Sequence, residues 1–307
     1  MSAGWVAGSV RARALARRRL GPENTRRLAS CGSLSDALRM LAATAYGANL
    51  RPGQPLAAAQ HEIASSVLWD LRVLAGWLPS EGVRLLRVLG AWFEMANVDE
   101  LLQSIAGRPA EAEFQLGALA TAWPRLRQAA SNGELRAALA TSAWQDPGGE
   151  STYAVRIGLR ARWAARAAAL GDPARTWAAG AVALLVAGER FAAGRAVDSA
   201  VMGSALSLLG PAASRAATLE EMAGGLPARA GWVLTGITAP ADLWRAEQAW
   251  LGRVERDGLR LLRTSGLDSG TVIGAVAVMA CDAWRVRAAL EIAARGGEPM
   301  GAYDELA

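Results

Sequence analysis

The stretch that decides the fold is Ser33-Leu34-Ser35-Asp36-Ala37-Leu38-Arg39-Met40-Leu41, because its pattern returns twice in the chain. The second copy is Ser131-Asn132-Gly133-Glu134-Leu135-Arg136-Ala137-Ala138-Leu139, and the third is Thr218-Leu219-Glu220-Glu221-Met222-Ala223-Gly224-Gly225-Leu226. In each copy an acid stands three positions after a hydroxyl residue, and apolar residues follow at helical spacing. An aromatic residue comes shortly after each copy: Tyr46, Trp144 and Trp232.

Each copy has the form of a capping box at the start of a helix. The hydroxyl of Ser33, Ser131 or Thr218 is placed to accept a hydrogen bond from a free N–H of the first turn. The carboxylate of Asp36, Glu134 or Glu221 is placed to reach back towards the N-cap. One box predicts only a helix start, whereas three boxes roughly ninety residues apart predict three copies of one helical unit.

Composition predicts an all-α chain. Alanine, leucine and arginine dominate, β-branched residues are sparse, and 52% of the 307 residues are hydrophobic. These abundant residues lose little conformational freedom on entering a helix. We expect helices over the following ranges: 6–20, 36–45, 56–78, 83–106, 116–130, 153–170, 173–191, 197–209, 240–263 and 271–295.

The repeat and the turn signals divide the chain into three expected modules, residues 1–110, 111–210 and 211–307. The strongest linker candidate is Asp146-Pro147-Gly148-Gly149. We expect the C-terminal helix, within residues 271–307, to pack near the first module.

Membrane-spanning, secreted and metal-binding classes have no support in the sequence. The longest apolar runs, 178–188 and 272–281, are about half the length that a membrane helix needs. Cys31 and Cys281 lie far apart in the chain, which favours a reduced compartment and buried thiols. His61 is the only histidine and lacks the second histidine of a zinc motif.

Catalytic chemistry is equally unsupported. The chain has no lysine, and no serine near His61 sits in a nucleophile elbow. The glycine pairs lack the strand-to-helix setting of phosphate-binding loops. We therefore predict no catalytic, metal or cofactor-binding residue, no cofactor, and a structural or mechanical role.

The chain contains 12 tryptophans, which have two interpretations. Large aromatic side chains can fill the gaps between alanine-rich helices, or they can line a ligand cavity. We expect core packing for most of them, on helices that are rich in leucine and alanine. The tryptophans concerned are Trp69, Trp77, Trp244, Trp250 and Trp284.

Arginine accounts for all 33 basic residues, and the formal net charge is +5. Arginines are frequent in the first helix but alternate with acids elsewhere, and no groove-entering motif accompanies them. A protein partner with an acidic surface therefore fits better than a nucleic acid. The candidate partner-binding residues are Arg11, Arg13, Arg17, Arg18, Arg285 and Arg287.

The two ends of the chain resemble a family of central-stalk subunits of V/A-type rotary ATPases, the C-type subunits, whose eukaryotic counterparts are the d-type subunits. The N-terminal similarity covers Gly4-Trp5-Val6-Ala7-Gly8-Ser9-Val10-Arg11-Ala12-Arg13-Ala14-Leu15, then Ser33 to Leu38 and Leu41 to Gly47. The C-terminal similarity covers Asp282-Ala283-Trp284-Arg285-Val286-Arg287 and Arg295-Gly296. The resemblance implies three similar helical modules in a funnel-like, pseudo-threefold arrangement.

The resemblance also implies a function. The proteins of this family are non-catalytic couplers of the central stalk that lie on the cytoplasmic face of the membrane and join the rotor shaft to the proteolipid ring. They transmit torque between ATP chemistry and the transport of protons or sodium ions. The expected partners are therefore the shaft subunits and the ring, and the expected location is cytoplasmic and peripheral to the membrane.

Two alternatives stay open at the level of the sequence. One is a free-standing helical scaffold or regulator of the same fold, suggested by Trp5 and Arg285 where the family usually has tyrosine and asparagine. The other is an all-α enzyme or ligand-binding protein with a tryptophan-lined cavity.

Overall fold

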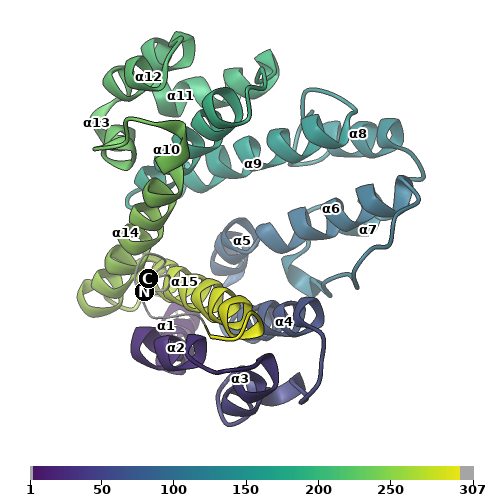
Figure 1. The fold of residues 1–307 in the computed structure, drawn as a ribbon, viewed down its shortest axis with the longest axis vertical. Helices are drawn as coiled ribbons and strands as arrows, with labels where there is room; N and C mark the ends of the chain where they lie inside the picture. The colour runs from purple at the N-terminus through teal and green to yellow at the C-terminus, as the bar shows by residue number, and fades with distance from the viewer. Residues whose placement is uncertain (1–2, 298–307) are drawn as a thin grey trace. The chain divides into compact units, whose positions relative to one another are not determined.

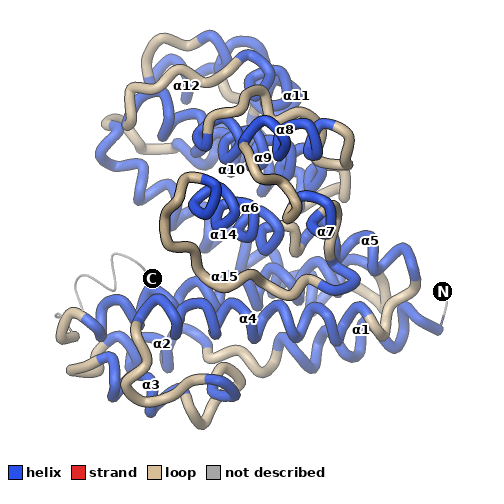
Figure 2. The backbone as a smooth tube through the Cα atoms, turned by 90° about the vertical axis from the view of Figure 1, so that its right-hand side faces the viewer, coloured by secondary structure: helices blue, strands red, loops and turns tan. Residues whose placement is uncertain are grey.

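The computed structural model describes residues 3–297, which form helices joined by turns and loops (Figure 1). Within this range no residue lies in a β-strand, so the predicted all-α class is confirmed (Figure 2). Residues 1–2 of the first expected module and 298–307 of the third lie outside the described residues.

The α-helices of the first half are α1 (Ala3–Ala16), α2 (Gly21–Ala29), α3 (Leu34–Leu41), α4 (Leu56–Ala75), α5 (Ser80–Leu89), α6 (Trp92–Ile105), α7 (Trp123–Leu126) and α8 (Asn132–Ala140). Those of the second half are α9 (Thr152–Ala168), α10 (Ala174–Ala187), α11 (Ser199–Arg215), α12 (Leu219–Gly225), α13 (Ala228–Gly231), α14 (Leu243–Thr264) and α15 (Ser269–Ala294). Short 3₁₀ segments are η1 (Gly47–Asn49), η2 (Gly117–Leu119), η4 (Trp232–Leu234) and η5 (Pro240–Asp242), and η3 (Gly188–Ala192) is a π-helical turn.

Two of the expected helices are wrong in extent. The helix predicted over 83–106 is broken at Gly90-Ala91 into α5 and α6. The helix predicted over 116–130 is mostly loop and contains only η2 and the single turn of α7. Pro124 has no N–H to donate, and the N–H groups before it bind a carboxylate of α6, so a continuous helix cannot form there.

The chain divides into two compact units. Unit 1 comprises Met1–Val83 with Leu251–Ala307, and unit 2 comprises Arg84–Trp250. The boundaries of the three expected modules, and their funnel-like arrangement, stay a prediction.

Unit 1 is assembled around α15, which packs against α1, α2, α3 and α4 (Figure 1). Most side chains of α15 are buried, including Val276, Val286 and Leu290. Close approach to α14 depends on a glycine, since a Cβ on Gly274 would lie only 2.7 Å from the carbonyl oxygen of Gly258. Helix α15, which contains the C-terminal similarity, is thus the central helix of unit 1.

Unit 2 has a core of small side chains contributed by α9, α10, α11, α12 and α13. Alanines such as Ala179 and Ala183 of α10 are fully enclosed, and Met222 and Leu209 fill the spaces between them. This packing agrees with the alanine-rich composition, because small residues let helix backbones approach closely and larger ones fill the remaining gaps.

The expectation that the tryptophans pack in the core is wrong for several of them. Trp69 is 60% exposed and Trp77 is 52% exposed, while Trp244 and Trp284 keep more than a third of their surface in solvent. Trp69, Trp244 and Trp284 lie on the outward sides of α4, α14 and α15, which helical spacing alone did not separate from the inward sides, and Trp77 lies in the turn after α4. Trp250, in contrast, is partly buried and packs against the core of unit 2.

Candidate functional site

All three repeated phrases begin a helix with the same N-cap hydrogen bond. The hydroxyl of Ser33 accepts from the N–H of Asp36 at 3.1 Å. The corresponding distances are 3.2 Å from the N–H of Glu134 to Ser131 and 3.1 Å from the N–H of Glu221 to Thr218.

The three acids complete the boxes in two ways. Glu134 and Glu221 accept from the N–H groups of Ala130 and Ala217, the residues just before each N-cap. Asp36 instead accepts from the Ser33 hydroxyl, at 2.6 Å. This hydrogen bond and Arg39 hold the pKa of Asp36 below its usual range.

A buried carboxylate in unit 1 joins the C-terminal helix to the first repeat. Asp282 of α15 is fully buried and accepts from the N–H groups of Leu20 and Gly21, both at 2.8 Å. It also accepts from the hydroxyl of Tyr46, the aromatic residue that follows the first capping box, at 2.8 Å. Burial and the Asp282 carboxylate raise the pKa of Tyr46 well above its usual value, so this hydroxyl keeps its proton and can donate it.

Unit 2 contains the same arrangement with a glutamate. Glu94 of α6 is 1% exposed and accepts from the N–H groups of Thr121 and Ala122, immediately before α7. Its third donor is the indole N–H of Trp144, the aromatic residue after the second capping box, at 2.8 Å. We call each set of three hydrogen bonds a carboxylate cap: Asp282 with Leu20, Gly21 and Tyr46, and Glu94 with Thr121, Ala122 and Trp144.

The two carboxylate caps serve the same physical purpose. Each carboxylate compensates N–H groups that have no partner at the start of a helix and lies at the positive end of that helix. A third, aromatic donor supplies a further hydrogen bond to the buried carboxylate. Each carboxylate cap therefore joins three chain segments: the helix that carries the carboxylate, the start of another helix, and the segment with the aromatic donor.

The third repeat has a related geometry but no carboxylate. Leu209-Gly210-Pro211 matches Leu20-Gly21-Pro22, and both glycines have positive φ, 73° and 79°. Ser214 donates to the carbonyl of Gly210 at 2.7 Å, as Thr25 does to the carbonyl of Gly21 at 2.6 Å.

Gly180 of α10 occupies the position in the third repeat that Glu94 has in the second. Trp144 follows Glu94 by 50 residues, and Trp232 follows Gly180 by nearly the same number. A Cβ on Gly180 would lie 2.9 Å from the ring of Trp232 and 2.9 Å from that of Trp250. The aromatic residue of the third repeat thus packs against a glycine instead of donating to an acid.

The sequence patterns do not single out the two buried carboxylates. Asp282 falls within the C-terminal similarity, but no role is attached to it there, and Glu94 belongs to none of the motifs. The repeated Leu-Gly-Pro triplet is a signal for the turn that the first and third repeats share, but it is absent from the second repeat and does not reveal Glu94.

Two of the six candidate partner-binding arginines have extensive contacts within the chain. Arg13 donates to the carbonyl oxygens of Ser265 and Gly266 at 2.7 and 3.1 Å, just beyond the C-terminus of α14. Arg285 is 7% exposed and pairs with Glu255 of α14. Both side chains stabilise unit 1.

The other four arginines lie nearer to solvent. Arg18 is exposed and pairs with Asp70 at 3.4 Å, whereas Arg11 is half-buried. Arg17 and Arg287 are exposed. The structure therefore leaves Arg17, Arg18 and Arg287 on the surface, and partner binding by all six stays a prediction.

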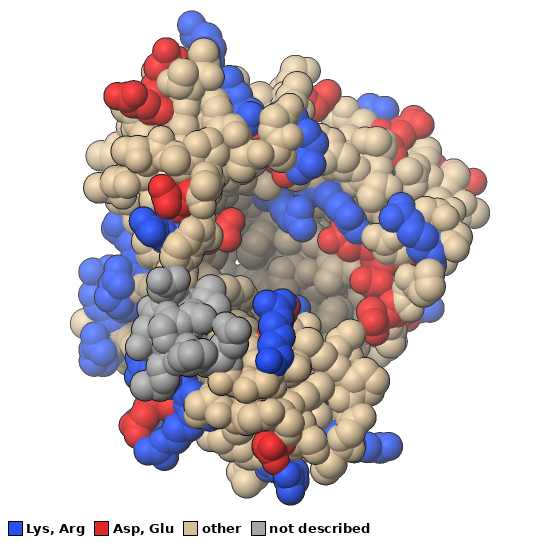
Figure 3. Space-filling model, viewed as in Figure 1, with Lys and Arg blue, Asp and Glu red and all other residues tan. Residues whose placement is uncertain are grey.

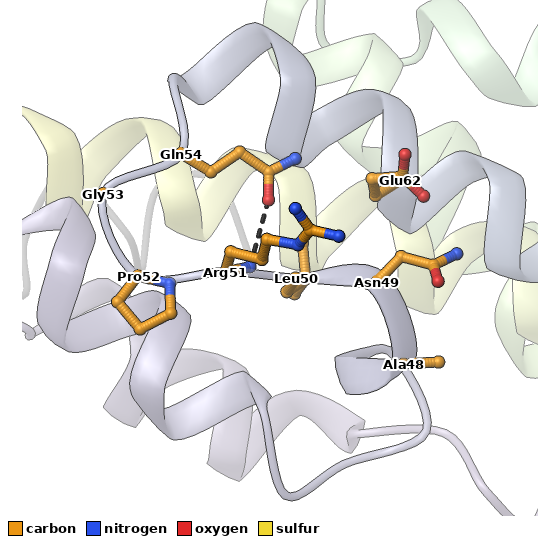
Figure 4. A pocket seen from close by; sticks show the side chains of 8 residues that line it. All are labelled: Ala48, Asn49, Leu50, Arg51, Pro52, Gly53, Gln54 and Glu62. Atoms are coloured by element: carbon orange, nitrogen blue, oxygen red, sulfur yellow. Dashed lines mark hydrogen bonds between the residues drawn. The ribbon is translucent and has the colours of Figure 1, made fainter.

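The described part of unit 1 contains a hollow of about 900 Å³ beside the start of α4 (Figure 4). Its lining consists of residues 48–54 together with Glu62. Arg51 and Glu62 are the charged residues of this lining, and the Gln54 side chain accepts from the N–H of Arg51 at 3.1 Å. The lining thus combines charged, amide and apolar side chains.

Two further findings concern residues 3–297. No helix in this part of the chain combines the length and the apolar composition needed to cross a bilayer. His, Cys, Asp and Glu side chains do not gather there in a group of three that could hold a metal ion.

Residues 3–297 form an all-helical structure in which the same N-cap hydrogen bond begins α3, α8 and α12. No protein-family model and no curated protein matches the chain.

Proposed function

We propose that this chain is a non-catalytic central-stalk subunit of a V/A-type rotary ATPase, which couples the rotor shaft to the membrane proteolipid ring during proton or sodium transport. The single observation that carries the proposal is the repeated unit. A helical segment that begins at a proline, a helix with a hydroxyl N-cap and an aromatic residue occur together three times, in the order Pro22, Ser33, Tyr46, then Pro124, Ser131, Trp144, then Pro211, Thr218, Trp232. Pro22 and Pro124 stand at the start of α2 and α7, whereas Pro211 begins the last part of α11, after the non-helical Gly210 that kinks it.

The helices that carry Asp282, Glu94 and Gly180 are α15, α6 and α10, and their order in the chain supports the proposal further. In the second and third repeats this helix, α6 or α10, precedes the proline-started helix in the chain. In the first repeat it is α15, which comes last in the chain. The last helix thus completes the first repeat. This agrees with the arrangement expected of a family that has three similar modules and that this chain resembles at both of its ends.

A torque-transmitting subunit has to be stiff. The carboxylate caps and the close glycine contacts between helices are features that give stiffness, because close-packed interiors transmit strain. Exposed arginines, among them Arg17, Arg18 and Arg287, provide charge for interfaces with acidic partners. The partners in this proposal are the shaft subunits and the proteolipid ring, and the protein is located on the cytoplasmic face of the membrane.

Affinity purification from the native cell in a mild detergent tests the proposal. The tagged chain is isolated, and the co-purifying proteins are identified and quantified by mass spectrometry. Recovery of shaft and ring subunits in stoichiometric amounts is the expected result. Recovery of the chain alone, from cells that make the ATPase, would contradict the proposal and favour a free-standing scaffold.

A further inference from the structure

An arginine stripe follows the outer face of α14 within unit 1. It consists of Arg253, Arg256, Arg260 and Arg263, which are spaced i, i+3, i+7 and i+10 and therefore lie on one side of the helix. Arg256, Arg260 and Arg263 are exposed, and Arg253 is partly exposed. In the space-filling view, arginine side chains gather at the left edge of the molecule, over α14 (Figure 3).

The stripe has more positive charge than its surroundings balance. Asp257 pairs with Arg260 at 2.9 Å and with Arg253 at 3.6 Å, and its own side chain is only 12% exposed. Within the described part of the chain, no carboxylate pairs with Arg256 or Arg263. Like charges three and four positions apart destabilise a helix, so the repulsion among these arginines lowers the stability of α14.

The outer face of this part of α14 also lacks exposed apolar side chains. Between residues 251 and 264 no large hydrophobic side chain is exposed, and the exposed residues are the three arginines and Thr264. A helix that lies in a lipid interface presents leucine, phenylalanine or tryptophan beside its basic residues. The stripe is therefore suited to a rigid acidic surface and poorly suited to insertion into a lipid interface.

We propose that the arginine stripe binds an acidic α-helix of a partner protein. Four arginines over ten residues extend about 15 Å along α14, at 1.5 Å per residue. A partner helix with acids at the same i, i+3, i+7, i+10 spacing matches them over this length when the two helices are nearly parallel. Guanidinium groups bind carboxylates through two parallel hydrogen bonds, so each arginine–acid pair is held by a defined geometry as well as by opposite charge. This inference stands on α14 alone and does not depend on the proposed rotary ATPase function.

The test uses two stapled, alanine-rich helical peptides of identical composition. One has glutamates at i, i+3, i+7 and i+10, and the other has the same glutamates distributed around the helix. Their affinity for the full-length protein is measured by fluorescence anisotropy at physiological salt. The expected result is that the patterned peptide binds about tenfold more tightly or better, which corresponds to about 1.4 kcal/mol.

Charge reversal identifies the site. The double variant R256E/R263E should lose the preference for the patterned peptide, and R256Q/R263Q should lose part of it. Both variants leave the pairs of Asp257 intact. The matched control is R84E/R108E, which reverses two exposed arginines in unit 2 and should bind like the unchanged protein.

Three outcomes would overturn the inference. Equal binding of the two peptides would show that spacing is irrelevant, and an unchanged affinity of R256E/R263E would place the site elsewhere. Stronger binding of phosphatidylserine vesicles or of duplex DNA than of the patterned peptide, lost in the same variant, would assign the stripe to a membrane or a nucleic acid.

Discussion

The hydroxyl of Tyr46 donates a 2.8 Å hydrogen bond to the carboxylate of Asp282, which follows it by 236 residues in the chain. The same carboxylate holds the N–H groups of Leu20 and Gly21. This buried carboxylate thereby adds hydrogen bonds to the packing of the C-terminal helix against the first repeat. Glu94 forms the matching hydrogen bond with Trp144 inside unit 2.

Replacing the Asp282 carboxylate with an amide should destabilise the protein strongly. D282N replaces one accepting oxygen with a donor, which leaves buried N–H groups unsatisfied, and we expect a loss of about 2–3 kcal/mol in the free energy of unfolding. Y46F removes one donor and should cost about 1 kcal/mol. Urea unfolding of both single variants and the double variant gives the coupling energy, expected between about 0.5 and 3 kcal/mol.

The control for this cycle is E23Q, which changes an exposed acid that pairs only with Arg27 on the surface. It should alter stability by less than about 1 kcal/mol. Strictly additive effects of D282N and Y46F would show that the hydrogen bond between the two residues contributes nothing.

Gly180 and Gly203 provide a matched pair of glycines inside helices. G180A places a methyl group 2.9 Å from two tryptophan rings and should destabilise the protein by about 1–3 kcal/mol. G203A meets nothing within 4 Å and should stabilise it by up to about 1 kcal/mol, because alanine favours the helix. Thermal unfolding of both variants measures the difference, and equal effects would contradict the packing of Trp232 on Gly180.

Cys281 should be unreactive in the folded protein. Burial, and next the negative charge of Glu255, raise the pKa of this thiol to about 12. The thiol of an unfolded chain has a pKa near 8.5, so the unfolded chain loses the proton first as the pH rises. The stability that the neutral thiol contributes is therefore complete below about pH 8.5 and is lost as the pH rises towards about 12.

Pulsed alkylation with mass spectrometry measures this protection at mildly alkaline pH. Cys31 is partly exposed and serves as the internal reference, which should react first. Modification of Cys281 at the same rate as Cys31 in the native protein would show that α15 is not the buried central helix of unit 1.

Arg285 and Arg287 should behave differently although they are two positions apart. R285Q leaves Glu255 without its partner in a mostly buried place and should cost about 3 kcal/mol. R287Q changes an exposed side chain and should alter stability by less than about 0.5 kcal/mol.

The two variants should also differ in affinity purification. R287Q, which stays folded, should recover less of the partner complex if Arg287 lies at an interface. Full recovery with R287Q would remove Arg287 from the candidate interface, and a fully stable R285Q would contradict the buried ion pair.

Local signals in the sequence predicted the helix starts well. Ser33, Ser131 and Thr218 are N-caps in the structure, because the capping box depends only on residues three positions apart. The all-α class follows from composition for a similar reason, since helix propensity acts residue by residue.

Long-range contacts explain what the sequence did not predict. The loop at 116–122 depends on Glu94, whose carboxylate takes two N–H groups that local reasoning assigned to a helix. The exposure of Trp69 depends on which side of α4 meets its neighbours, and that of Trp77 depends on where α4 ends, two residues before it. Arg285 looked like a surface residue because its partner, Glu255, is on another helix.

Ion pumping in membrane vesicles tests the proposed coupling role most directly. Inverted vesicles are prepared from native cells that lack this chain, and ATP hydrolysis and ATP-driven ion uptake are measured in parallel. A coupler predicts that hydrolysis continues while uptake is lost, and that the purified protein restores uptake when it is added back. Normal ATP-driven uptake in the absence of the chain would contradict the coupling role.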